Sequence, residues 1–247
     1  MKADPSAQLR LLDLQALDSQ VDHLRHRRNH PVEAAEIKEL LGKRADVDGR
    51  LRDQRIVVDD LSAAQAKADA DVEQVKARRK RDRDRMDSGA ISNPKDLERM
   101  QHELATLERR ITVLEDEEIE VMEQVEEAGS ALAELTAALE QIDARLGVLT
   151  SARDERAAEL DQEIATVAAG RDAIVAELPA DLLALYEKLR AAKDGVGAAE
   201  LRVRACTGCR ITLDPGELNV LRSTPEDTVV RCQECMRILV RGAESGL

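Results

Sequence analysis

The stretch from residue 97 to 149, LERMQHELATLERRITVLEDEEIEVMEQVEEAGSALAELTAALEQIDARLGVL, decides the fold of this 247-residue chain. Alternating steps of three and four residues from Leu97 to Leu149 meet an apolar side chain at fifteen of sixteen positions, and Glu118 is the exception. A 3.5-residue period sustained over this length is typical of the seam of a coiled coil. The stripe weakens after Leu149 and resumes at Leu160.

A second stripe precedes the first. The same steps from Ile37 to Val75 meet an apolar residue at nine of twelve positions, and a shorter run extends from Leu14 to Leu24. Pro31 separates the two runs, and a proline ring clashes with the preceding helical turn and donates no hydrogen bond. We therefore expect the helix to break at residues 29–31.

A turn signal separates the two long stripes. Ser88-Gly89 can end the first helix, because glycine suits the left-handed position after a helix. Asn93-Pro94 can start the second, with Asn93 as N-cap and Pro94 at the first helical position. A short turn at about residues 88–96 predicts an antiparallel hairpin. Arms of about 80 residues would extend about 120 Å.

The pattern changes after Leu178-Pro179. A short apolar-striped helix is predicted over 180–192, followed by short strands at 201–203, 228–230 and 237–240 and by helical turns at 215–222, and the tail from Gly242 is expected to fray. The predicted fold is mainly α: a long antiparallel coiled-coil helical hairpin (residues 1–178) joined to a short helix and a small C-terminal β-rich zinc ribbon with four cysteine ligands (residues 179–247).

All four cysteines lie in two CxxC pairs, Cys206/Cys209 and Cys232/Cys235, separated by 22 residues. Two such knuckles, the first with Gly208 as a permissive backbone position, can aim four thiolates at one point, and a tetrahedral sulfur shell suits Zn²⁺. A closed shell leaves no position for a catalytic water, so we expect one structural Zn²⁺.

Three segments, CTGCRITLDPGELNVLRSTPEDTVVRCQECMRILV, ISNPKDLERMQHEL and LLDLQALDSQVDHLRHR, together resemble the bacterial C4-type zinc-ribbon proteins. The resemblance covers nearly the whole chain and implies a helical hairpin followed by a ribbon, with the four cysteines as zinc ligands. Members often carry an aromatic residue after RIL, where this chain has Val240. The resemblance further implies an adaptor or regulator that binds proteins and sometimes RNA.

Composition excludes several classes. Tyr186 is the only aromatic residue, whereas compact α/β enzymes fill their cores with aromatic rings. The net charge of −13 opposes indiscriminate nucleic-acid binding. No signal peptide or apolar span of about 20 residues is present, and the clustered cysteines do not form a disulfide framework, so the predicted location is the cytoplasm.

Charge is unevenly distributed along the hairpin. Residues 76–99 carry nine basic and five acidic side chains, whereas residues 111–163 carry three basic and sixteen acidic ones. The basic turn could contact an acidic protein or a nucleic acid, or it could be a solvated helix exterior. The candidate contact residues are Arg78, Arg79, Lys80, Arg81, Arg83, Arg85, Ile91, Asn93 and Lys95, and Ile91 is expected to be exposed.

No catalytic motif accompanies these features, so the chain is not expected to be an enzyme. The leading hypothesis is a non-catalytic zinc-binding adaptor whose hairpin binds partner proteins. The alternative is an RNA- or DNA-binding regulator that uses the basic turn and the ribbon arginines. No membrane or small-molecule partner is expected, and the seam can be satisfied within one chain or between two. The histidines His23, His26 and His30 indicate either a solvated helix face or a second metal site.

Overall fold

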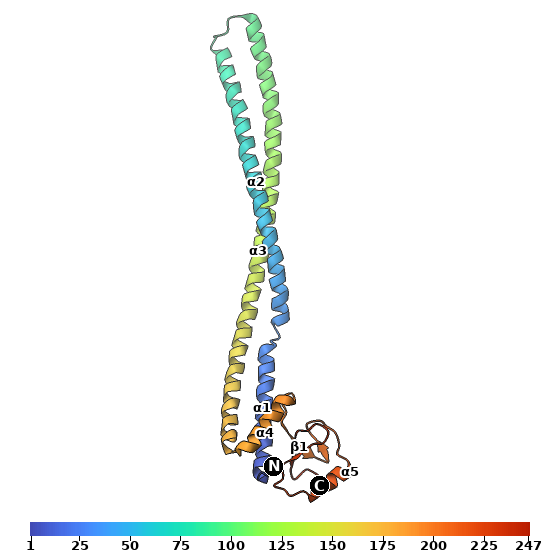
Figure 1. The fold of residues 1–247 in the computed structure, drawn as a ribbon. Coiled ribbons are helices and arrows are strands. Elements are labelled where there is room, and N and C mark those ends of the chain that lie inside the picture. Colours follow the sequence, from blue (N-terminus) through green and yellow to red (C-terminus); the bar gives the residue numbers. More distant parts are fainter. The chain divides into compact units, whose positions relative to one another are not determined.

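The computed structural model describes residues 1–247 and confirms a mainly helical fold with a small strand region near the C-terminus (Figure 1). The elements are α1 (Pro5–Asn29), α2 (Ala34–Asp87), α3 (Pro94–Glu177), α4 (Ala180–Ala192), β1 (Ala198–Arg202), β2 (Ala205–Cys206), α5 (Pro215–Ser223), β3 (Val230–Arg231) and β4 (Ile238–Arg241). None of the helices contains a stretch that is both long and apolar enough to cross a bilayer.

The chain forms two compact units. Unit 1 comprises Met1–Ala34 and Ser151–Leu247, and unit 2 comprises Ala35–Thr150. These units group segments by contact, so the predicted domain boundary at residue 178 stays a prediction.

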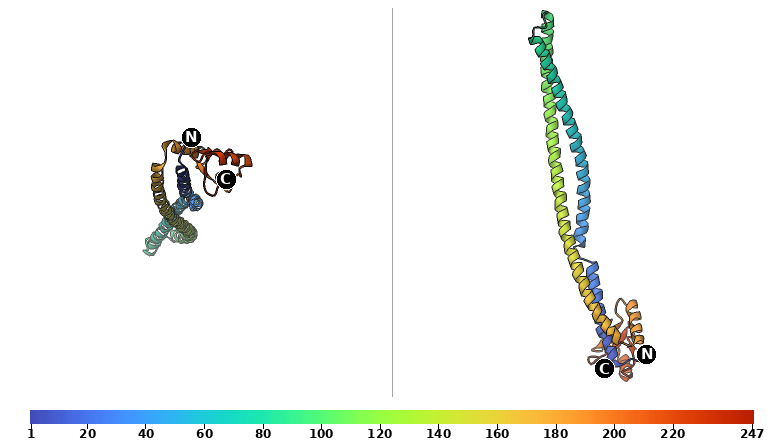
Figure 2. Two further views of the ribbon diagram at one scale, coloured as in Figure 1. Left: turned by 90° about the horizontal axis from the view of Figure 1, so that it is seen from below. Right: turned by 90° about the vertical axis from the view of Figure 1, so that its left-hand side faces the viewer.

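Unit 2 is a helical hairpin in which α2 and α3 run side by side in opposite directions (Figures 1 and 2). All sixteen positions of the predicted α3 stripe are buried or half-buried, and of the twelve on α2 only Arg44 is exposed. The polar seam residue Gln54 donates to the carbonyl of Ala128 at 3.0 Å, so its amide is not left unpaired. The two stripes therefore meet within one chain.

The predicted turn and the predicted helix break are both confirmed. Gly89 adopts a positive φ of 71°, and the Asn93 side chain accepts from the backbone N–H of Lys95 at 3.0 Å. Helix α1 ends at Asn29, and α2 begins only at Ala34, beyond Pro31. Local backbone chemistry therefore sets the helix limits.

Unit 1 contains a four-stranded sheet in the order β2-β1-β4-β3, in which only the β1/β4 pair is parallel. Alternate strand residues face opposite sides of the sheet. On one side, Ala198, Ile238 and Val240 belong to a core with residues of α1, α3 and α4. On the other side, Ala199 and Leu239 pack with residues of α5 and two of the cysteines.

Two details of the ribbon differ from the sequence-based expectation. Val203 lies beyond β1, in a two-residue turn with Arg204, and both have positive φ values, 48° and 62°. The tail is not frayed, because the carbonyls of Glu244 and Ser245 accept from the backbone N–H groups of Val203 and Arg204 at 2.8 and 2.9 Å. Pairing with the tail thus holds this turn in place.

Candidate metal centre

Each CxxC segment folds into the same tight backbone knuckle. The N–H of Arg210 donates to the carbonyl of Cys206 at 2.7 Å, and the N–H of Met236 donates to that of Cys232 at 2.9 Å. Arg210 and Met236 share a left-handed backbone, with φ values of 62° and 63°. The second cysteine of each pair is thereby turned back toward the first.

The four thiols converge on one point. All four Sγ atoms lie within 4.8 Å of one another, and the Cys206–Cys235 and Cys209–Cys232 pairs are each 3.9 Å apart. A tetrahedral ion with bonds of about 2.3 Å to sulfur requires sulfur–sulfur distances of about 3.8 Å. The geometry therefore fits one Zn²⁺ bound by four sulfurs.

The electrostatics of the thiols also fit a cation. Burial raises the pKa of Cys206 to about 12 and raises the pKa of Cys232. Burial acts in the same direction on Cys235, but hydrogen bonds from Arg237 and the neighbouring cysteines outweigh it and lower its pKa to about 7. Four thiolates at this spacing repel one another, and a dication would stabilise all of them.

Two residues fix the first knuckle against the rest of unit 1. A Cβ at Gly208 would lie 2.9 Å from the Cβ of Ala199, so close packing, rather than a left-handed backbone, requires glycine there. The Arg237 guanidinium donates to the carbonyls of Val196 and Lys193 at 2.9 and 3.0 Å, and its weakest bond reaches Gly208. The metal centre is thereby tied to the loop after α4.

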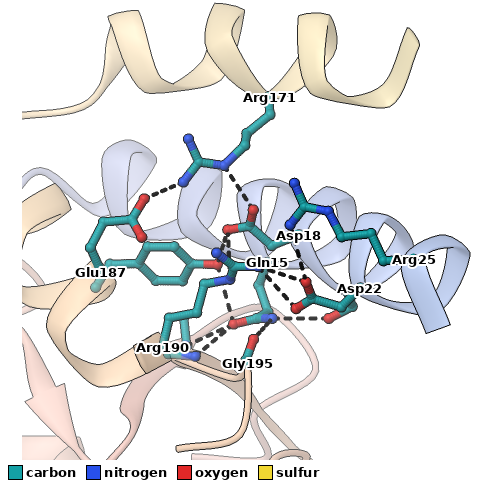
Figure 3. A network of polar contacts seen from close by, with 12 residues as sticks. Gln15, Asp18, Asp22, Arg25, Arg171, Glu187, Arg190 and Gly195 are labelled. Atoms are coloured by element: carbon teal, nitrogen blue, oxygen red, sulfur yellow. Dashed lines mark hydrogen bonds and ion pairs between the residues drawn. The ribbon is translucent and has the colours of Figure 1, made fainter. Parts of the chain in front are cut away.

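A buried amide of α1 connects this loop to the helices of unit 1. The Oε1 atom of Gln15 accepts from the backbone N–H groups of Gly197 and Ala198 at 2.7 and 3.3 Å, and its Nε2 donates to the carbonyl of Gly195 at 2.9 Å (Figure 3). Backbone groups of the loop that precedes β1 are therefore satisfied by one side chain of α1.

The neighbouring carboxylate of Asp18 is only 2% exposed. It accepts from the hydroxyl of Tyr186 at 2.6 Å and from Nε of Arg171 at 2.7 Å, and Nε of Arg190 lies 3.4 Å away (Figure 3). Burial, followed by the bond to Asp18, raises the pKa of Tyr186 above its ordinary range. This network joins α1, α3 and α4, and sequence inspection missed it because its members are far apart along the chain.

The candidate contact residues at the turn of unit 2 fall into two groups. Arg78 and Arg79 form ion pairs with Glu103 and Glu108 of α3. The remaining cations are exposed and form no ion pair; they are Lys80, Arg81, Arg83, Arg85 and Lys95. Asn93 acts as the cap of α3, and Ile91 is half-buried, so the expectation of an exposed Ile91 is wrong.

The histidines of α1 lie on its solvated side. His23, His26 and His30 are exposed, and the rings of His26 and His30 stack with centroids 4.2 Å apart. The cluster of potential metal ligands in the chain is the set of four cysteines.

Comparison with known proteins defines the family. Residues 14–194 match the CT398-like coiled coil hairpin domain. The chain belongs to this family. Residues 205–239 match the C4-type zinc ribbon domain, which together with the clustered cysteines confirms the prediction of one structural zinc. The resemblance found in the sequence is therefore confirmed as well.

Relatives of this CT398-like protein share its full architecture. An uncharacterized Mycobacterium tuberculosis protein is 36% identical over 98% of both chains, and one from Mycobacterium leprae is 28% identical over 88% of this chain and 93% of its own. A Mycobacterium smegmatis structure matches with a TM-score of 0.84 and 37% identity, covering 98% of this chain and all of that one. CT398 of Chlamydia trachomatis has a TM-score of 0.66 at 17% identity and 96% and 98% coverage, which shows a shared fold.

Proposed function

We propose that this CT398-like protein is a non-catalytic adaptor whose hairpin binds partner proteins and whose zinc, held by Cys206, Cys209, Cys232 and Cys235, is structural. The observation that carries the proposal is the apolar surface of unit 2. Seven large apolar side chains are exposed outside its seam: Leu41, Ile56, Val57, Val113, Ile119, Met122 and Val148. A two-helix coiled coil buries one stripe on each helix, so its other faces remain free to pack against helices of another protein.

The donor set supports a structural metal. Four sulfurs complete a tetrahedron and leave no coordination position for water or substrate. When bound, such an ion supplies folding free energy to a small sheet. Reduced cysteines suit a reducing compartment, so we place the adaptor in the cytoplasm.

The experiment compares partner capture by the intact protein and by Ile119→Asp/Met122→Asp. Both side chains are about half exposed, so the variant should keep its helical circular dichroism while losing apolar contact area. The matched control is Thr112→Asp/Gln124→Asp, which adds the same charge at exposed polar positions of α3. Partners identified by mass spectrometry should be retained by the control and lost by the variant. Equal capture by all three proteins would refute a role for this surface.

A second candidate function, nucleic-acid binding, is favoured by the five unpaired cations at the turn of unit 2. Such binding would rest on phosphate contacts and would weaken steeply with salt, because no aromatic side chain is present there to stack on a base. The test is a titration with RNA and with duplex DNA at two salt concentrations, repeated with Lys80→Glu/Arg81→Glu/Arg83→Glu/Arg85→Glu. Micromolar, salt-sensitive binding lost in this variant would favour the regulator over the adaptor.

A further inference from the structure

Unit 2 carries two adjoining segments of opposite charge. The tip segment, residues 76–110, has eleven basic and seven acidic side chains, a net charge of +4. The shaft segment, residues 56–75 and 111–128, has thirteen acidic side chains and one basic one, Lys67, a net charge of −12. The hairpin thus presents a cationic end directly beside a strongly anionic stretch.

Neither set of charges is satisfied within the chain. The tip segment holds five exposed cations without an ion pair, as described above. In the shaft segment, ten carboxylates form no ion pair: Asp59, Asp60, Asp69, Asp71, Asp116, Glu118, Glu120, Glu123, Glu126 and Glu127. Across the seam, Glu118 is close enough to Asp69 that burial and this neighbour raise the pKa of Glu118. Like charges therefore face each other in the shaft segment, and a positively charged partner would relieve the repulsion.

We propose that two copies of this chain associate antiparallel through unit 2, with the tip segment of each copy lying on the shaft segment of the other. At 1.5 Å per residue, the tip segment extends about 25 Å and the shaft segment about 30 Å. An antiparallel overlap of about 50 Å therefore forms both contacts at once. The two contacts are equivalent and related by a twofold axis, which closes the assembly as a dimer.

Electrostatics select this orientation. A parallel pairing in register would place the two shaft segments side by side, with −12 against −12. In the antiparallel overlap the shaft centres are about 25 Å apart, beyond two Debye lengths of about 8 Å, so their repulsion is screened while the tip–shaft ion pairs remain in contact. Val113, Ile119 and Met122, each about half exposed, lie in the shaft segment and supply apolar area to the same contact.

A second copy fits the tip segment better than a nucleic acid does. A polyphosphate lying along the tip would continue over the adjoining −12 segment and be repelled there. A second hairpin instead offers carboxylates opposite the tip and cations opposite the shaft. The inference does not depend on the adaptor function, because the dimer needs no other partner.

The test is sedimentation velocity on the full-length, zinc-loaded protein. The intact chain should form a dimer at low salt, and raising the salt from about 50 to about 300 mM should weaken the association at least about tenfold. The tip variant Lys80→Glu/Arg81→Glu/Arg83→Glu/Arg85→Glu and the shaft variant Glu120→Lys/Glu123→Lys/Glu126→Lys/Glu127→Lys should each be monomeric. None of these eight side chains forms an ion pair in the chain, so helical circular dichroism should be unchanged.

Mixing the two variants gives the decisive measurement. The basic tip of the shaft variant then meets the unaltered shaft of the tip variant, and the reversed tip meets the reversed shaft, so dimers should return. The control Glu134→Lys/Glu140→Lys/Glu159→Lys/Glu163→Lys makes the same charge change on α3 outside the overlap and should leave the dimer intact. A monomeric intact protein at about 100 μM and low salt, or a mixture that stays monomeric, would overturn the proposal.

Discussion

Replacing Asp18 by Asn tests whether the buried polar network holds unit 1 together. The substitution keeps the volume of the side chain but removes the charge that faces Arg171 and Arg190. Removing one partner of a buried ion pair costs about 3–5 kcal/mol. Arg171 retains its pair with Glu187, Arg190 retains Asp22 at 2.9 Å, and the two arginine side chains are 23% and 20% exposed. We therefore expect a smaller loss, about 2–3 kcal/mol in the free energy of unfolding of unit 1.

The only aromatic residue provides an independent readout. Tyr186 is fully buried, and burial, followed by the hydrogen bond to Asp18, raises its pKa above the ordinary value of about 10. A raised native pKa stabilises the fold at every pH below the unfolded pKa, and this stabilisation is lost as the pH rises above about 10. Absorbance at 295 nm should therefore stay constant through pH 10 in the folded protein, and ionisation should begin at lower pH in Asp18→Asn.

Urea unfolding followed by circular dichroism at 222 nm measures the stability term. Asp13→Asn is the control, because Asp13 is an exposed α1 carboxylate paired with Arg10, and its loss should cost under about 1 kcal/mol. If Asp18→Asn is no less stable than Asp13→Asn, and if tyrosine ionises as in the intact protein, the network does not stabilise unit 1.

Three further predictions concern the ribbon. Chelation of zinc should unfold the sheet but leave most of the circular dichroism at 222 nm, because the seam of unit 2 contains no metal ligand; loss of all helix in step with zinc would contradict this. Val203→Asn should stabilise the protein by about 0.5–1 kcal/mol in urea unfolding, because the β-branched side chain now occupies a left-handed turn position that asparagine tolerates; a decrease would contradict the strain. Arg241→Met should destabilise the protein by about 2–4 kcal/mol in the same assay, since its guanidinium donates to five carbonyls at and after the end of α5, and an unchanged midpoint would show that water replaces them.

The hairpin and the metal centre were predictable because both are written locally. A 3.5-residue apolar period specifies a seam wherever the chain runs, and Gly89 and Asn93-Pro94 specify where the helices end. The CxxC pairs specify a metal through their own spacing, so only the folding of the two knuckles beside each other remained to be seen.

The polar network could not be predicted, because its partners are set by tertiary packing. Asp18 lies 153 residues from Arg171 and 168 from Tyr186 along the chain, and nothing near Asp18 distinguishes it from the solvated carboxylates of other helices. The β-branched side chain of Val203 favours a strand, but pairing of its N–H with the tail overrides that preference. Long-range hydrogen bonds decide each of these positions.

The way hydrogen bonds and charges are satisfied separates stability from binding in this protein. In unit 1 the polar side chains of the network are almost fully paired internally, with only one oxygen of Glu33 and Nε of Arg190 lacking a hydrogen bond among buried side-chain atoms. In unit 2 the seam is satisfied, yet exposed apolar side chains and unpaired ions of both signs remain. Substitutions in unit 1 should therefore act through folding, whereas charge or apolar substitutions outside the seam of unit 2 should act through association at unchanged stability. That separation is what allows the charge-swap and capture experiments to report on binding alone.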